Sequence, residues 1–120
     1  MFNFEKLDAW KKAISLADLV YRASRTFPAD ERFGLTNQIR RAAVSVSSNL
    51  AEGCSRSSKQ EYARFVEIAT GSAFEVASQA VIACNQGYLD AAQFEQIQGG
   101  ALEITRMLSG LRQSLLASAS

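Results

Sequence analysis

Histidine is absent from the 120 residues of this chain. Catalytic triads of the Ser-His-Asp type and Cys-His pairs need an imidazole, and so do most zinc and iron sites. The di-iron four-helix bundles likewise depend on a Glu-x-x-His motif on two helices. We therefore expect no catalytic residues, no metal and no cofactor, and we interpret the chain as a non-enzymatic protein.

Proline, cysteine and long apolar runs are also scarce. Pro28 is the single proline, so few positions force the chain out of a helix. Cys54 and Cys84 form no spaced ligand motif, and two thiols without an apolar signal segment fit a reducing compartment. In residues 68–89 Glu75 is the only charged residue, but Thr, Ser, Asn and Gln make this stretch too polar to span a membrane. We expect a cytoplasmic protein with no membrane segment.

Helical periodicity is what the sequence does contain. Apolar residues recur at spacings of three and four in four segments: residues 5–27, 35–51, about 58–86, and from about 90 onward. The predicted boundaries are a proline after the first segment, a glycine after the second and third, and a capping residue before the third and fourth. These residues are Pro28, Gly53, Gly87, Ser58 (in a capping box with Glu61) and Asp90.

Apolar stripes along the first and fourth segments predict which residues form the core. The stripe of the first segment is Leu7, Trp10, Ile14, Ala17 and Tyr21. That of the fourth is Phe94, Ile97, Ala101, Ile104, Leu108, Leu111 and Leu115. Because short connections between long amphipathic helices favour antiparallel neighbours, we expect one all-α domain over residues 1–120, an antiparallel up-down-up-down four-helix bundle.

The third segment has more apolar surface than one stripe of a bundle accounts for. One face carries Phe65, Ala69, Val76, Ala80 and Ala83, whereas Phe74, Val81 and Ile82 lie well away from it. The second segment shows the same surplus more weakly, because Val44 and Ala51 lie opposite its apolar stripe. Surplus apolar surface predicts a homo-oligomer, and the alternative is a monomer with a wide core.

A polar stripe flanks the apolar one on the second segment. Its members lie within about 80° of one another, and two residues of the third segment are placed to meet them. A buried Glu75 would need an arginine partner, either Arg40 or Arg41. The alternative is that Glu52 and Glu75 are paired carboxylates for acid–base chemistry or metal binding, although arginine neighbours keep carboxylates ionised. We assign the set to a structural polar network: Arg40, Arg41, Ser45, Asn49, Glu52, Ser72 and Glu75.

Charge is unevenly distributed along the chain. Residues 1–64 contain 11 Lys and Arg against 7 Asp and Glu, a net charge of +4, whereas residues 65–120 contain 2 against 5, a net charge of −3. Basic side chains can contact phosphates, and a symmetric assembly would multiply a modest patch. An ordinary solvated surface is the alternative, since acidic residues interleave. The candidate nucleic-acid contacts are Lys11, Arg22, Arg25, Arg56 and Lys59.

A family signature accompanies these patterns. The four-helix bundle proteins linked to 23S rRNA intervening sequences have a motif that is similar to residues 38–43, Ser45 and residues 49–53 here. Their second block resembles residues 68–69, 71–72 and Glu75, while Ser47 stands where the family often has proline. The resemblance implies a four-helix bundle, often assembled as a ring of five. It also brings in the related accessory protein of diversity-generating retroelements, which works with a reverse transcriptase and nucleic acid.

Two functions from different classes follow from these observations. The first is a homo-oligomer, pentameric by the resemblance, that binds RNA, DNA or a nucleic-acid enzyme through basic surfaces. The second is an oligomeric scaffold for protein interactions without affinity for nucleic acid. An enzyme that uses the carboxylates ranks last.

Overall fold

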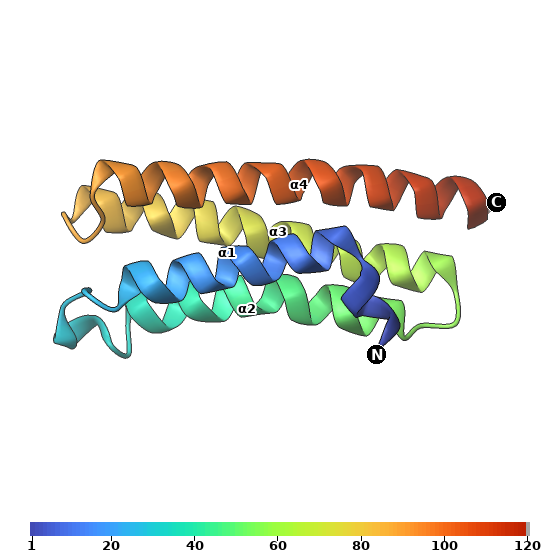
Figure 1. Ribbon diagram of the computed structural model, residues 1–120, viewed down its shortest axis with the longest axis horizontal. Coiled ribbons are helices and arrows are strands. Elements are labelled where there is room, and N and C mark those ends of the chain that lie inside the picture. The colour runs from blue at the N-terminus through green and yellow to red at the C-terminus, as the bar shows by residue number, and fades with distance from the viewer. Residues whose placement is uncertain (120) are drawn as a thin grey trace.

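The computed structural model describes residues 1–119, and Figure 1 shows long helices joined by short connections. Four long helices lie along a body of 48 × 22 × 21 Å: α1 (Asp8–Ser24), α2 (Leu35–Cys54), α3 (Lys59–Asn85) and α4 (Ala91–Ala119). Two short 3-10 turns, η1 (Asn3–Lys6) and η2 (Ala29–Glu31), precede α1 and α2. Within residues 1–119 no strand is present, so the predicted all-α class with four helices is confirmed.

The helices pack in cyclic order. Each helix contacts the next one in the chain, and α4 contacts α1. Within the described residues no Cα atoms of α1 and α3, or of α2 and α4, come within 8 Å of each other, so these pairs occupy diagonal corners. Figure 1 shows the α1–α2 and α3–α4 connections at one end of the bundle and the α2–α3 connection at the other.

Most helix ends have the local chemistry that the sequence predicts. The Ser58 hydroxyl accepts a hydrogen bond from the Glu61 N–H at 3.0 Å and so caps α3. At the start of α4 the Asp90 carboxylate accepts from the Gln93 N–H at 2.7 Å, and the Gln93 side chain accepts from the Asp90 N–H at 3.0 Å. Gly87 follows α3 with a φ of +80°, a conformation in which glycine has no steric penalty.

The prediction that Gly53 ends α2 is wrong. The helix continues to Cys54, and Gly53 is buried inside it. A β-carbon at this position would lie 3.0 Å from Cβ of Phe65 and 3.0 Å from Cδ1 of Tyr62, closer than most carbon atoms pack. Gly53 therefore permits α2 and α3 to approach each other closely.

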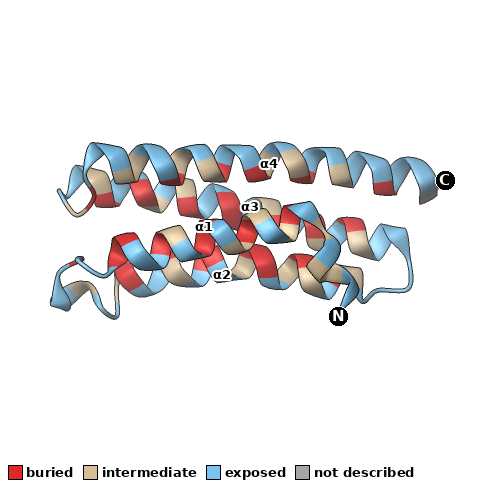
Figure 2. Ribbon diagram, in the orientation of Figure 1, coloured by how far each residue is buried: buried red, intermediate tan, exposed pale blue. Residues whose placement is uncertain are grey.

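The core lies along the inward faces of all four helices, as Figure 2 shows. The predicted stripe of α4 is confirmed at five positions, namely Ile97, Ala101, Ile104, Leu108 and Leu115. Of the predicted stripe of α1, Ala17 is buried and Leu7 and Trp10 pack half-buried against the core, but the fully buried face is rotated onto Ala9, Ala13, Leu16, Ala17, Val20 and Ala23. Small alanines let α1 approach its neighbours, whereas the larger Trp10 and Ile14 are only half-buried at the rim and Tyr21 is exposed.

Candidate nucleic-acid interface

Three members of the predicted polar network meet where α2 crosses α3. The hydroxyl oxygens of Ser45 and Ser72 lie 2.9 Å apart. The amide nitrogen of Asn49 donates to the Ser45 hydroxyl at 2.9 Å and to the Ser45 carbonyl oxygen at 2.8 Å. Ser72 is buried and the other two residues are half-buried, so these bonds join the helices inside an otherwise apolar contact.

The expectation of a buried Glu75 with an arginine partner is wrong. Glu75 is exposed, and Arg40 turns towards α1 instead, where its Nε donates to the Ser24 hydroxyl at 2.8 Å. The Arg40 guanidinium also lies 4.7 Å from the ring centroid of Tyr21. Successive residues on a helix differ by about 100° in direction, so Arg41 is exposed between the α1 and α3 sides of α2 and lines a groove on each side. Arg41 and Glu75 line opposite sides of an open groove between α2 and α3.

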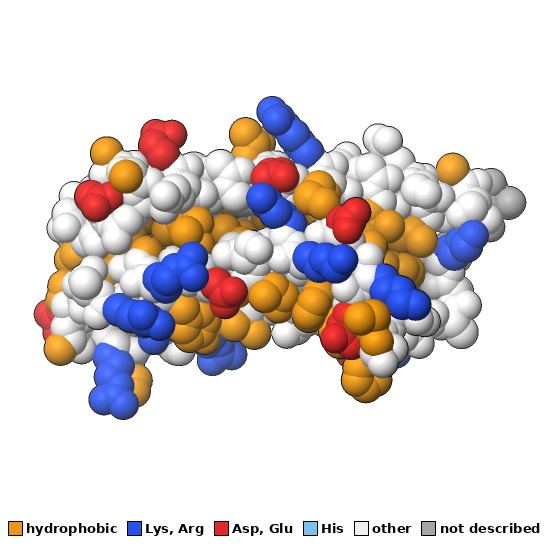
Figure 3. All heavy atoms as spheres, viewed as in Figure 1, with side chains coloured by type: hydrophobic (Ala, Val, Ile, Leu, Met, Phe, Trp, Pro, Cys, Tyr) orange, Lys and Arg blue, Asp and Glu red, His pale blue; other side chains and the backbone are white. Residues whose placement is uncertain are grey.

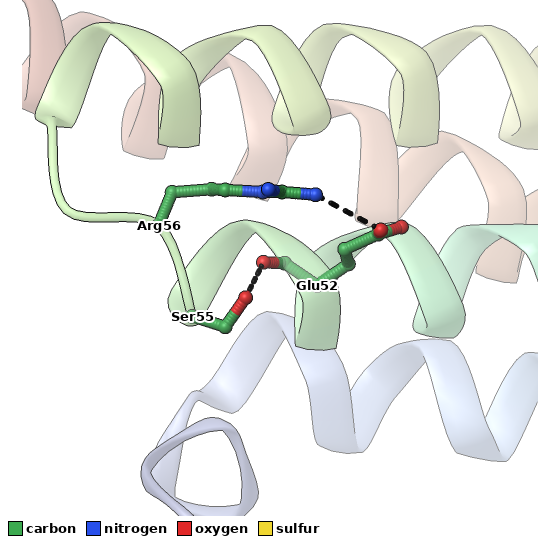
Figure 4. Close-up of polar contacts among 3 residues, drawn as sticks. All are labelled: Glu52, Ser55 and Arg56. Atoms are coloured by element: carbon green, nitrogen blue, oxygen red, sulfur yellow. Dashed lines mark hydrogen bonds and ion pairs between the residues drawn. The ribbon is translucent and has the colours of Figure 1, made fainter.

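Glu52 lies apart from Glu75. It sits near the end of α2, where its Oε1 is 3.0 Å from Nη2 of Arg56 and its carbonyl oxygen accepts from the Ser55 hydroxyl at 2.6 Å (Figure 4). Given the Ser45–Ser72 contact, Glu52 and Glu75 are separated by about ten helical residues, or roughly 15 Å along the bundle. Glu52 and Glu75 are therefore too far apart to act together as a pair of carboxylates. No group of three or more Cys, Asp or Glu placed to hold a metal ion occurs in residues 1–119.

The five predicted nucleic-acid contacts do not form one patch. Arg22 and Arg25 lie at the end of α1, next to the α1–α2 connection, whereas Arg56 and Lys59 lie at the α2–α3 connection, at the opposite end. The 20 residues of α2 alone separate these ends by about 30 Å. Lys11 is exposed in the first turn of α1. Their part in binding stays a prediction.

Two of these five cations are engaged within the chain. Besides its ion pair with Glu52, Arg56 holds its guanidinium 4.7 Å from the ring centroid of Phe65. The Lys59 ammonium donates to the Ser118 hydroxyl at 3.0 Å. Such surface contacts are weak, so a phosphate can compete for both side chains.

Sequence reasoning missed a group of arginines and aromatic rings at the α1–α2 end. Arg40 covers Tyr21, and the guanidinium of Arg32 lies 5.3 Å from the ring centroid of Phe33. Arg32 and Phe33 are adjacent in the connection before α2, and that adjacency was the only available signal. The Tyr21–Arg40 pair joins two helices. The sequence pattern places Tyr21 in the apolar stripe of the first segment, so it gives no sign of this pair.

Two tyrosines have phenol groups that are harder to ionise than usual. Partial burial is the main cause that raises the pKa of Tyr62, and the contact of its hydroxyl with the Cys54 sulfur, 3.1 Å long, raises it further. A hydrogen bond to the Glu31 carboxylate, 3.1 Å long, is the main cause that raises the pKa of Tyr88. Both phenols are therefore neutral at physiological pH, and neither is poised as a base.

Comparisons with known proteins identify a family from the sequence and a similar fold among solved structures. The family model described as "23S rRNA-intervening sequence protein" matches residues 5–110. Among solved structures, a protein of unknown function from the S23 ribosomal protein family of Bacteroides thetaiotaomicron has a TM-score of 0.78 at 21% sequence identity, over 87% of this chain and 97% of that one. No curated protein shows significant sequence similarity. Neither of the two descriptions names an enzyme.

Proposed function

Because this chain belongs to the 23S rRNA-intervening sequence protein family, we propose that it is a non-enzymatic, homo-oligomeric helical bundle that binds nucleic acid, or a nucleic-acid enzyme, through basic surfaces. The pentameric number in this proposal follows from the resemblance. The cytoplasm is the proposed location, and unpaired Cys54 and Cys84 are compatible with it. No helix in residues 1–119 is long and apolar enough to cross a membrane.

The proposed bundle is antiparallel, with an up-down-up-down order. Contacts between α2 and α3 support this direction. Gly53, late in α2, meets Phe65 early in α3, and Ser45 meets Ser72 at the middle of both helices. Earlier in α2, Arg41 shares a groove with Glu75, which comes later in α3.

The outer face of α3 supports self-assembly. Phe74 is 64% exposed, and Ile68, Val81 and Ile82 are exposed beside it. Residues 76–89 carry no charge, so this face presents apolar groups to water without a flanking ion on the last three turns. Gly71 lies on the same face with open space above it, which leaves room for a neighbour to approach. Another copy of the chain is the partner we propose, because exposed apolar surface of this kind is typical of subunit contacts.

The observation that carries nucleic-acid binding is the distribution of unpaired cations. Ion pairs among the described residues join Lys12 to Glu103, Arg56 to Glu52 and Arg112 to Glu67. None involves an arginine at the α1–α2 end, although five lie there: Arg22, Arg25, Arg32, Arg40 and Arg41. Unpaired guanidinium groups attract phosphates, and the excess of basic residues in the first half of the chain strengthens the attraction.

Light scattering tests both parts of the proposal. The solution mass is measured alone and with a short mixed-sequence RNA, at low and at high salt. We expect an oligomer that gains RNA mass at low salt and loses it at high salt, because phosphate contacts release counterions. An oligomer that ignores RNA at both salt concentrations would refute nucleic-acid binding, and a monomer would refute the assembly.

Charge reversal tests the basic surface directly. A double variant, Arg22→Glu with Arg25→Glu, is expected to weaken RNA binding and to make its salt dependence shallower, without changing the oligomer. Arg106→Glu with Lys6→Glu is the control, because it alters net charge equally at exposed positions outside the α1–α2 end. Equal losses in both double variants would show that bulk charge, and not this surface, governs binding.

The engaged state of Arg56 and Lys59 favours the scaffold as a second candidate. If the α2–α3 end uses its cations to hold Glu52 and Ser118, that end contributes structure and not recognition. The scaffold then predicts a stable oligomer whose mass is insensitive to RNA, DNA and salt.

A further inference from the structure

An open groove runs between α1 and α2 at the arginine-rich end. Its lining combines an aromatic ring, two guanidinium groups, an amide and a hydroxyl, and its volume is about 470 Å³. Protein sites for small ligands typically have about 300–1,000 Å³, so the groove has room for part of a nucleotide chain. The residues are Tyr21, Asn37, Arg40, Arg41, Val44 and Ser45.

The electrostatics of the groove favour an anion. Arg40 is held by neutral oxygens, those of the Ser24 hydroxyl at 2.8 Å and the Tyr21 carbonyl at 3.5 Å, so its charge is not cancelled. Arg41 is exposed and has no ion pair with any described carboxylate. Glu75 faces Arg41 from α3 only across the neighbouring α2–α3 groove.

The five arginines share this end of the bundle with five acidic residues, Asp18, Asp30, Glu31, Asp90 and Glu95, but none of these lines the α1–α2 groove. Glu95 shares a different groove, between α1 and α4, with Arg22. Both carboxylate oxygens of Glu31 accept hydrogen bonds within the chain: Oε1 from the Leu35 N–H at 3.2 Å and Oε2 from the Tyr88 hydroxyl at 3.1 Å. Asp18 and Asp30 are exposed. Figure 3 shows Lys and Arg side chains gathered at the lower left, over the end that carries the α1–α2 connection.

An exposed aromatic ring precedes the groove residues of α2 along the chain. Phe33 is 86% exposed, four residues before Asn37, in the connection that leads into α2. A phenyl ring so exposed does not gain the hydrophobic stabilisation of burial. The Arg32 guanidinium, 5.3 Å from the ring centroid, can cover only one face of the ring and leaves the other face free. An aromatic ring next to guanidinium groups is the combination on which unpaired bases stack.

We propose that this end of the bundle binds single-stranded nucleic acid, with phosphates held by Arg40 and Arg41 along the α1–α2 groove and one base stacked on Phe33. The inference deepens the proposed function and rests on it. A duplex buries both faces of its bases, so Phe33 offers it nothing, whereas a single strand can place a base on the ring. Because α1 and α3 occupy diagonal corners, another copy packed on the outer face of α3 does not need to cover α1.

Fluorescence anisotropy with three labelled probes tests the proposal: a 12-nucleotide RNA, the DNA strand of the same sequence, and the duplex of that DNA strand. Phe33→Ala is expected to weaken binding of the single strands roughly 5- to 100-fold, the effect of one stacked base, and to leave duplex binding unchanged. Phe2→Ala, which removes a ring that is 72% exposed at the opposite end of the bundle, is the matched control and is expected to have no effect. Phe33→Trp should restore affinity, because indole also stacks.

The arginine half of the site has its own readout. Arg41→Gln is expected to lower the salt slope of single-strand binding by about 0.7, one phosphate contact, whereas Phe33→Ala leaves the slope unchanged. Arg106→Gln, on the exposed surface of α4, is the control. Equal affinity for RNA and DNA strands means that the site reads bases and phosphates without the 2′-hydroxyl, and preference for RNA adds a sugar contact; both support the site.

Three results would overturn the inference. Duplex binding as tight as single-strand binding would remove the stacking argument, and so would Phe33→Ala with the affinity of the parent protein. Either result leaves the proposed function standing, because nucleic acid is still bound. A parent protein that binds none of the three probes at low salt refutes the proposed function together with this inference.

Discussion

The hydroxyl oxygens of Ser45 and Ser72 lie 2.9 Å apart at the middle of α2 and α3. Asn49 adds a second bond to Ser45, and Ser72 also donates to the Ile68 carbonyl oxygen at 3.2 Å. Apolar helix contacts tolerate small shifts of one helix along the other, whereas a buried hydroxyl that loses its partner costs free energy. We therefore propose that the pair fixes the register of the two helices.

Replacing Ser72 with Ala should lower the free energy of unfolding by about 1 kcal/mol, the net value of one hydrogen bond. Ser45 keeps its bond from Asn49, so no hydroxyl is left entirely without a partner. Urea denaturation measures the change, and Ser78→Ala, at an exposed position of the same helix, is the control and should stay within about 0.5 kcal/mol of the parent. Equal losses in the two variants would contradict a role in register.

Replacing Gly53 with Ala should destabilise the bundle by about 1–3 kcal/mol. Alanine favours a helix over glycine by up to about 1 kcal/mol, but its β-carbon would meet Phe65 and Tyr62 at 3.0 Å, and overpacking at such distances costs more. Gly110→Ala is the matched control, because nothing lies within 4 Å of its β-carbon and the helix preference then acts alone. Thermal melting should give opposite shifts, and stabilisation by both variants would show that α2 and α3 can move apart.

Polar substitution on the outer face of α3 should dissociate the oligomer without unfolding the chain. Phe74→Glu with Ile82→Glu places charges where the proposed contact is apolar, and both side chains are already exposed in the single chain. Leu116→Glu, on the last turns of α4, is the control. Light scattering should report the monomer mass for the double variant with unchanged helix content by circular dichroism. An intact oligomer would place the subunit contact elsewhere.

Stability should fall as the pH rises above about 10, the pKa of tyrosine in an unfolded chain. The folded state raises the pKa of Tyr62 by burial, so above this pH the unfolded chain releases a proton that the folded chain retains. The folded state then binds more protons, and the free energy of unfolding decreases with pH. Urea midpoints between pH 9 and 11 should decline less steeply for Tyr62→Phe than for the parent, and parallel declines would exclude Tyr62 as a cause.

Local signals made much of the fold predictable. Ser58 and Asp90 cap their helices as expected, and Gly87 adopts the positive φ that its place after α3 suggested. The sequence also predicts the surplus apolar surface of α3, because a helix buried along one stripe leaves Phe74 and Ile82 exposed to solvent. Each of these features depends on residues within a few positions of one another.

The errors arise where a residue is defined by another helix. Gly53 resembles a helix end in sequence, but the closeness of Phe65 explains it. Glu75 is placed by its sequence to meet the polar stripe of α2, yet it is exposed at the rim of the α2–α3 groove. Arg40 and Arg41 look equivalent in sequence, but Arg40 binds Ser24 of α1, whereas Arg41 is exposed between the α1–α2 groove and the α2–α3 groove. The candidate site at the α1–α2 end required this directional information.

The contact between α1 and α4 joins the two ends of the chain, as the 2.8 Å ion pair between Lys12 and Glu103 illustrates. During synthesis α1 emerges first, but the helix that completes its surroundings emerges last. Because translation adds about 5–20 residues per second, the apolar face of α1 stays uncovered by α4 for roughly 5–20 s. A newly made chain is thus most vulnerable to misassembly with other nascent copies before residue 103 has left the ribosome, and the speed of translation of the residues that follow α1 sets the length of that interval.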